Sequence, residues 1–247
     1  MLPNLPRSLR KELLDGPLPD RESLLGNLRD LEWVNRFAGG GAVVTWALGR
    51  LVDGLEERQF RLLDVGTGGG DIPLAVVRWG RRRGLELTVD GVDLRPEIVE
   101  LARERVGHES SVRITCGDAL TLEEPVGTCD FVLCSNALHH LSPEECVTFL
   151  RSAYRIAGRA LIVNDLRRCR AGWLLARLGA AAIFESSEAR HDGPLSVLRA
   201  YTADEIASFA RSAGLRDFEV VHRPPFRLCL IARRQKSSGL EPGTGVY

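Results

Sequence analysis

The sequence predicts an α/β fold in which a mostly parallel sheet carries helices on both faces. From about residue 60 onward, short apolar runs alternate with helical segments. Glycine or aspartate follows the first three of these runs. Alternating strands and helices need crossover connections, and these place helices on both faces of a parallel sheet. The 247 residues are 44% hydrophobic and 27% charged, which is enough for one sizeable core.

Two helices are expected before the first strand. Apolar residues recur at three- and four-residue steps from Leu24 to Phe37, after a possible Asp20 cap, and the pattern stops at three glycines, residues 39–41. A second helical stretch runs to about Leu55. We therefore predict a helical cap over residues 1–57, a main domain over residues 58–234, and a disordered tail over residues 235–247.

Seven strands are expected, with helices between most of them. Helices begin near Pro73, at Pro96, after Ser142 and at the capping box formed by Thr202 and Glu205. The last two strands are separated by two prolines, as in a hairpin. The strands predicted from the apolar runs are 62–65, 86–93, 112–116, 130–134, 160–163, 218–221 and 226–232.

A lone apolar helix over residues 171–184 interrupts this alternation. Its apolar residues cover most of its girth, and such helices are normally buried. Either it completes the core or, with the N-terminal helix, it roofs an apolar pocket. A polar loop is expected after it, so residues 167–200 form a predicted lid over a substrate.

Composition narrows the possible partners. Lys plus Arg and Asp plus Glu both number 33, so no net charge attracts nucleic acid. The six cysteines form no C-x-x-C pair, which predicts reduced core residues, and no metal site is predicted. No signal peptide or membrane span is apparent. We expect a soluble cytoplasmic protein, monomeric or homodimeric.

A glycine-rich segment follows the first strand. It reads Asp64-Val-Gly66-Thr67-Gly68-Gly-Gly70-Asp71. Ligands of parallel sheets bind at the carboxyl ends of the strands, where glycines allow close backbone approach and helix N-termini offer free amides. The dinucleotide fingerprint G-x-G-x-x-G fails in both possible registers. The spacing is D-x-G-x-G-x-G instead.

Carboxylates follow the next two strands. Asp93 ends the second strand, where it could accept the two hydroxyls of a ribose, and Asp118 follows the third, where it could accept an adenine amino group. Each aspartate alone is more simply explained as a helix cap. Acidic residues after three successive strands favour a nucleoside site.

These motifs resemble those of the class I S-adenosylmethionine-dependent methyltransferases. The segments LLDVGTGGGD, VDGVD, CGDAL and CDFVLCSNALHHLSPEE carry the resemblance over residues 60–167. It implies a Rossmann-like, seven-stranded sheet with an antiparallel last strand and S-adenosyl-L-methionine as cofactor. It also implies cofactor contacts at Asp64, Gly66, Thr67, Gly68, Gly70, Asp93, Leu94, Asp118, Ala119 and Asn136.

Three histidines are candidate catalytic bases. His139 and His140 follow the fourth strand, and an imidazole there could take a proton from a phenol or enol. The same pair could simply pack the loop against the cofactor. His191, beside Asp192, is the other candidate, although a solvated pair explains it equally.

Further side chains are possible ligand contacts of lower rank. Arg36 interrupts the apolar face of the first helix, and its guanidinium could reach the cofactor's carboxylate, although such a residue is often solvated. Polar residues late in the chain could touch the acceptor: Asn164, Asp165, Arg199 and Tyr201.

The predicted function is methyl transfer to a lipophilic small molecule, most simply to a hydroxyl of a phenolic, quinone or polyketide-like compound of secondary metabolism. One alternative is a methyltransferase for protein or nucleic acid. The [DNS]-P-P-[FYW] motif of nucleobase enzymes is replaced here by Ser135-Asn136-Ala137-Leu138. The other alternative is a non-catalytic cofactor-binding protein on the same fold.

Overall fold

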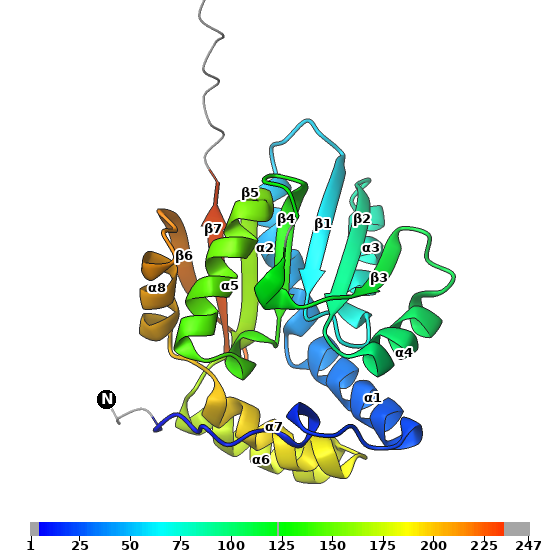
Figure 1. Cartoon of the computed structure of the whole chain (residues 1–247), viewed down its shortest axis with the longest axis vertical. Coiled ribbons are helices and arrows are strands. Elements are labelled where there is room, and N and C mark those ends of the chain that lie inside the picture. Colours follow the sequence, from blue (N-terminus) through cyan, green and yellow to red (C-terminus); the bar gives the residue numbers. More distant parts are fainter. Residues whose placement is uncertain (1–4, 123, 235–247) are drawn as a thin grey trace, which may run out of the picture.

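The computed structural model describes residues 5–122 and 124–234 and has a seven-stranded sheet at its centre (Figure 1). The strand order is β3-β2-β1-β4-β5-β7-β6. β7 is antiparallel to both neighbours, and the other pairs are parallel. The predicted fold class is confirmed. The strands are β1 Gln59–Val65, β2 Glu86–Asp93, β3 Val112–Cys116, β4 Cys129–Ser135, β5 Ala157–Leu166, β6 Asp217–Arg223 and β7 Arg227–Arg233.

Helices cover both faces of this sheet, so its central strands are apolar along almost their whole length. α2 (Gly40–Val52), α3 (Asp71–Arg82) and α4 (Pro96–Val106) pack on one face. α5 (Pro143–Ile156) and α8 (Ala203–Ser212) pack on the other. α2 thus belongs to the layers of the main domain rather than to a separate cap.

The register of the sheet aligns the ends of four strands. Val65 of β1 pairs with Val92 of β2 and with Cys134 of β4, and Ser135 of β4 pairs with Asn164 of β5. The residues that follow these strands therefore meet at one edge, where ligands of parallel sheets bind.

Four elements gather beyond this edge and form what we call the cover (Figure 1). They are the short 3-10 helix η1 (Leu13–Asp15), α1 (Arg21–Phe37), α6 (Arg170–Ile183) and α7 (Ser187–Arg199). α6 packs along α7, and α7 contacts both α1 and η1. Segments from the two halves of the sequence thus close over the same end of the sheet.

The polar loop predicted after the apolar helix is wrong, because α7 occupies that position. Ser186 caps α7, its hydroxyl accepting the Ala189 N–H at 3.0 Å, and Leu195 and Val197 bury its inner face. Gly193 and Pro194 lie inside the helix. Glycine and proline are both unfavourable inside a helix, so the sequence pattern did not predict α7.

α6 lies on the surface rather than in the core. Leu174, Leu175 and Leu178 are each more than half exposed, and the buried residues of the helix are Gly172 and Ala180. Of the two alternatives for this helix, the structure fits the roof. No helix within the described ranges is long and apolar enough to cross a membrane.

Two further predictions concern the cysteines and the C-terminal residues. All six cysteines are free, but the predicted core location holds for four of them; Cys116 is exposed and Cys169 half-buried. The predicted tail over residues 235–247 lies outside the described residues.

Candidate active site

A cavity of about 880 Å³ lies between the carboxyl edge of the sheet and the cover. The loops after β1, β2, β3 and β4 form its floor, and α1, η1, α6 and α7 form its walls. Small-molecule sites in proteins have volumes of about 300–1,000 Å³. The cavity is therefore large enough for a nucleoside cofactor together with a second small molecule.

The glycine loop, residues 66–70, turns the chain sharply at the floor of the cavity. The N–H groups of Gly66 and Thr67 both donate to the Val92 carbonyl, at 2.8 and 3.0 Å. Gly68 has φ +53°, and a Cβ built on it meets no atom within 4 Å. The backbone at Gly68 thus faces open space, which suits close approach by a ligand.

Gly70 has a different role from the one predicted. It does not line the cavity, and a Cβ placed on it would approach Val106 of α4 to 3.0 Å. This glycine lets the turn before α3 lie against α4, so the structure does not support it as a cofactor contact.

Asp64 lies beneath the glycine loop and is almost fully buried. Its Oδ2 accepts a hydrogen bond from the Thr67 hydroxyl at 2.7 Å, and its Oδ1 has no partner. Burial, reinforced by the nearby Asp71 and Asp93 carboxylates, raises the pKa of Asp64 to about 7.

This raised pKa gives a testable pH dependence of stability. An aspartate in an unfolded chain has a pKa of about 3.9, so the folded protein holds an extra proton on Asp64 between about pH 4 and pH 7. This contribution to stability decreases as pH rises through that window. Relative to wild type, Asp64→Asn should therefore be more stable at pH 8 than at pH 5, measured by urea unfolding. Asp90→Asn is the matched surface control, and an identical pH dependence for Asp64→Asn and wild type would contradict the assignment.

The ends of β2 and β3 present their predicted residues to the cavity. Asp93 Oδ2 accepts the Gly68 N–H at 2.9 Å, and its Oδ1 accepts the Arg95 N–H at 3.2 Å. Asp118 lines the cavity and also caps a short turn, accepting the Leu120 N–H at 2.8 Å. Leu94 and Ala119 line the same part of the cavity.

Asp93→Ala should weaken S-adenosylmethionine binding by roughly tenfold to a hundredfold. A hydrogen bond to a charged group is worth about 1.5–3 kcal/mol, and each 1.4 kcal/mol is a factor of ten. Calorimetric titration measures the effect. Asp90→Ala is the matched control, because Asp90 lies on the same strand but pairs with Arg113 at the surface. Equal affinities for Asp93→Ala and Asp90→Ala would show that Asp93 does not bind the cofactor.

The loop after β4 is fixed by a buried polar network. Asn136 adopts φ +56°; its amide donates to Asn35 Oδ1 at 2.7 Å, and its Oδ1 accepts from Arg227 Nη1 at 2.7 Å. Asn35 in turn donates to Asp71 at 3.0 Å. Asn136 lines the cavity as predicted, with its side chain held by these neighbours.

Arg36 does not lie in the cavity. Its exposed guanidinium stacks over the Phe37 ring at 5.2 Å, because its position on α1 faces solvent. Two other arginines line the cavity: Arg95, which follows β2, and Arg227, which is buried at the start of β7. Burial lowers the pKa of Arg227 to about 10, and its Nη2 has no hydrogen-bond partner.

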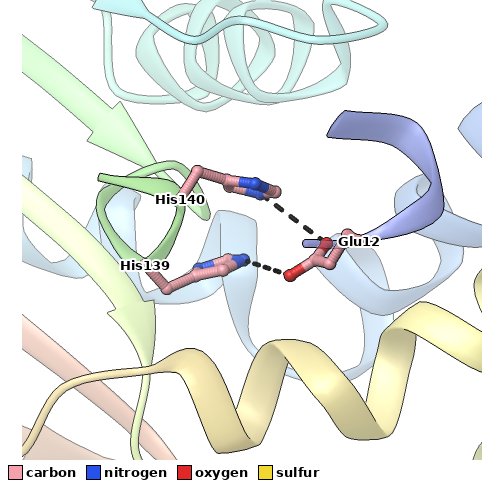
Figure 2. A group of neighbouring side chains, drawn as sticks. All are labelled: Glu12, His139 and His140. Carbon is pink, nitrogen blue, oxygen red and sulfur yellow. Dashed lines mark ion pairs between the residues drawn. The ribbon is translucent and has the colours of Figure 1, made fainter. Parts of the chain in front are cut away.

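His139 and His140 project into the cavity toward Glu12 of the N-terminal segment (Figure 2). His139 is buried, and its Nδ1 lies 2.7 Å from Asp165, whose other oxygen accepts the His139 backbone N–H at 2.9 Å. His140 is partly exposed, and its Nδ1 lies 2.8 Å from Asp15. Each imidazole is thus oriented by its own carboxylate.

The charges around His139 set its protonation. Burial alone lowers the pKa of His139, but the carboxylates of Asp165 and Glu12 outweigh it and raise the pKa above the ordinary histidine value. Conversely, although burial raises the pKa of Asp165, His139 and two backbone N–H groups lower it overall. The two groups thus stabilise each other's charged forms.

His191 does not line the cavity. It is exposed on α7, and its Nδ1 lies 2.8 Å from Asp192. The buried Asp192 accepts the backbone N–H groups of Leu13 and Leu14 at 3.0 and 3.3 Å. Asp192 therefore holds the N-terminal segment over the cavity, and His191 does not present a base to it.

The remaining predicted polar residues support the walls without lining the cavity. Asn164 donates to the Ser135 hydroxyl at 2.7 Å, and the Tyr201 hydroxyl donates to the Leu141 carbonyl at 2.7 Å. Arg199 contacts the Asp15 carboxylate and donates to the His140 carbonyl at 3.2 Å. In this lower-ranked group, Asp165 is the residue that is hydrogen-bonded to the imidazole ring of a cavity-lining histidine, His139.

Several site residues escaped the sequence analysis. Glu12 and Asp15 stand three residues apart in a segment without strong periodicity, and no motif marks them. Asn27 lines the cavity from α1 and is 2% exposed, with its Oδ1 unpartnered. A polar residue on the otherwise apolar face of α1 was the available signal for Asn27. Arg227 was hidden because it begins an apolar strand.

Comparison with known proteins supports the inferred family. Residues 62–158 match the methyltransferase domain family. A ubiquinone biosynthesis O-methyltransferase from Xanthomonas euvesicatoria is 29% identical over 165 residues, 66% of this chain and 65% of that protein. A demethylmenaquinone methyltransferase from Deinococcus radiodurans is 31% identical over 103 residues, 41% of each chain. The chain thus spans less than two thirds of the length of these relatives.

Solved structures share the fold. A SAM-dependent methyltransferase from Aquifex aeolicus superposes with a TM-score of 0.59 at 21% identity, covering 83% of this chain and 96% of that one. Human N-acetylserotonin methyltransferase in complex with SAM gives 0.60 at 22% identity, covering 86% and 56%. These likenesses show a shared fold, and the match to the methyltransferase domain family covers residues 62–158, which include the glycine loop.

Proposed function

We propose that the protein transfers the methyl group of S-adenosylmethionine to a hydroxyl of a lipophilic small molecule, in particular a phenolic or quinone-type compound. One observation carries the proposal: an oriented histidine and a glycine loop with an open backbone face line the same cavity. The relatives named as a ubiquinone biosynthesis O-methyltransferase and a demethylmenaquinone methyltransferase support a quinone-type acceptor.

Two features at the floor of the cavity fit a bound cofactor. The space beside Gly68 would be filled by any side chain, and the buried Asp64 Oδ1 is left without a partner at the same floor. Gly66, Gly68 and Asp93 would hold the nucleoside end, with Asp118 and Ala119 beside the base. When bound, S-adenosylmethionine supplies an electrophilic methyl group, so the protein needs to place an acceptor oxygen and exclude water.

The cover supplies an apolar wall for the acceptor. Leu31 and Phe37 of α1 face the cavity together with Leu175 and Ile183 of α6. These four side chains are 40–61% exposed, so an apolar acceptor that covers them would gain roughly 25 cal/mol for each Å² removed from water. This wall favours a lipophilic compound over a polar macromolecule.

His139 is the proposed base in this reaction. The Asp165 carboxylate accepts a hydrogen bond from the Nδ1–H group, so the lone pair of the neutral imidazole is on Nε2, on the side of the cavity. Nε2 can then take the hydroxyl proton as the oxygen attacks the methyl group. The Asp165 carboxylate stabilises the imidazolium that forms.

Binding and transfer should be measured separately. Calorimetry is expected to detect S-adenosylmethionine binding, and radiolabel from the cofactor is expected in alkylated phenols and hydroquinones rather than in tRNA or protein. Label in a macromolecule would overturn the acceptor class. Cofactor binding without transfer to any of these acceptors would favour a non-catalytic role.

A further inference from the structure

The histidine cluster, defined as Glu12, His139 and His140, has an unusual geometry (Figure 2). His139 Nε2 lies 3.6 Å from one oxygen of Glu12, and His140 Nε2 lies 3.8 Å from the other. Hydrogen bonds between nitrogen and oxygen measure about 2.7–3.2 Å. The three side chains therefore face one another at ion-pair distances, marked by the dashed lines in Figure 2, that are too long for hydrogen bonds.

Both imidazoles are held as metal-binding histidines usually are. In metal sites the ring nitrogen that does not touch the ion commonly donates its proton to a carboxylate, which fixes the tautomer. Here His139 Nδ1 is paired with Asp165 at 2.7 Å and His140 Nδ1 with Asp15 at 2.8 Å. Both free lone pairs consequently lie on Nε2, on the side of Glu12.

Glu12 supplies an independent observation. The side chain is 6% exposed, yet its Oε1 has no hydrogen-bond partner. A buried carboxylate oxygen without a partner is costly and calls for an explanation such as an ion. Arg199 Nε lies 3.7 Å from Oε1, beyond hydrogen-bonding range.

We propose that Glu12, His139 and His140 bind one divalent transition-metal ion, such as Zn²⁺. Zinc bonds to imidazole nitrogen and carboxylate oxygen are about 2.0–2.2 Å long, so tetrahedral ligands lie roughly 3.3–3.6 Å apart. The observed separations approach this range, and the three ligand atoms lie within 4.8 Å of one another. Mixed nitrogen and oxygen ligands favour zinc-like ions over Mg²⁺ or Ca²⁺.

The charge around the cluster suits a divalent ion. Glu12, Asp15 and Asp165 carry three negative charges, whereas Arg199 brings one positive charge and pairs with Asp15. Arg7 donates to the carbonyls of His139 and Leu141, which leaves a net charge of −1 among these five side chains. With three protein ligands, a fourth position remains for water or an acceptor.

This ion would change how an acceptor hydroxyl is ionised, a consequence that rests on the proposed function. An ion on His139 Nε2 occupies the lone pair that would otherwise take the proton. A hydroxyl bound at the fourth position would instead lose its proton to solvent, because the cation lowers its pKa. Ion binding itself does not depend on methyl transfer.

The test measures metal binding in the full chain without cofactor or acceptor. We expect one equivalent of Zn²⁺ to remain after dialysis, measured by elemental analysis, and Co²⁺ to give the visible absorption of a tetrahedral site. Loss of a partner that orients a zinc ligand lowers affinity about 10–100-fold. Glu12→Gln and His140→Gln should each lower affinity at least that much, and Asp15→Asn by about tenfold.

His108→Gln is the matched control, because His108 is exposed in the turn between α4 and β3, outside the cavity. It should retain the full affinity, and circular dichroism establishes that each variant is folded. The proposal is overturned if wild type retains no ion, or if Glu12→Gln and His140→Gln bind as tightly as His108→Gln. If the protein transfers methyl groups but retains no metal ion, the proposed function stands and the proposed ion site is wrong.

Discussion

Gly68→Val is expected to lower S-adenosylmethionine affinity by at least about a hundredfold while the protein stays folded. Gly68 has φ +53°, and the direction of its missing side chain is open space inside the cavity. A valine would place two methyl groups where the cofactor should lie. The expected loss is about 2.8 kcal/mol, at 1.4 kcal/mol per factor of ten.

The matched control separates lost space from backbone strain. Gly84 has φ +67° and also meets no atom within 4 Å, but it lies after α3, away from the cavity. Valine at positive φ is strained at either position, so both variants should lose similar stability. Calorimetry should detect weak binding in Gly68→Val and normal binding in Gly84→Val. Equal affinities would show that the glycine loop does not hold the cofactor.

The sheet was predictable because short apolar runs mark its strands and polar or glycine-rich segments follow several of them. Asp93 ends β2 and Asp118 lies two residues after the end of β3, so predicting the strands also placed these residues at the carboxyl edge of the sheet. The cover was less predictable. Its helices α6 and α7 depend on each other and on η1 for burial, and Gly193 and Pro194 interrupt the pattern of α7.

Site residues that lie next to a strand in the sequence were predictable. Site residues that come from distant parts of the sequence were not. His139 and His140 follow β4 closely, and both line the cavity. Glu12 reaches them from 127 residues earlier in the sequence, because Asp192 of α7 holds the N-H groups of Leu13 and Leu14. That contact depends on tertiary structure, which periodicity and motifs do not describe.

The sequence pattern also could not show on which side of α1 Arg36 lies. On α1, Asn35 and Arg36 are adjacent, so their side chains point about 100° apart at 3.6 residues per turn. Asn35 faces the cavity and Arg36 faces solvent. The sequence marks a polar interruption of the helix face, whereas packing against the sheet decides which of the two residues enters the site.

His139→Gln is expected to lower the rate of methyl transfer by about 10²–10⁴-fold, with cofactor affinity retained. The variant keeps a polar side chain but loses a group that can accept a proton at neutral pH. The assay should use chelator-treated protein, so that the imidazole acts without an ion, and a phenol with a pKa near 10, which needs a base. Single-turnover measurements report the transfer step directly.

The pH profile distinguishes a base from a packing residue. His139 must be neutral to accept the proton, so the wild-type rate should fall as pH drops through its raised pKa, and His139→Gln should lose this acidic limb. His140→Gln should mainly weaken cofactor binding and keep the limb, because His140 is tied to Asp15 and partly exposed. If both variants transfer methyl at the wild-type rate, neither histidine is the base. If His139→Gln loses stability and cofactor affinity together while the limb persists, His139 only packs the loop.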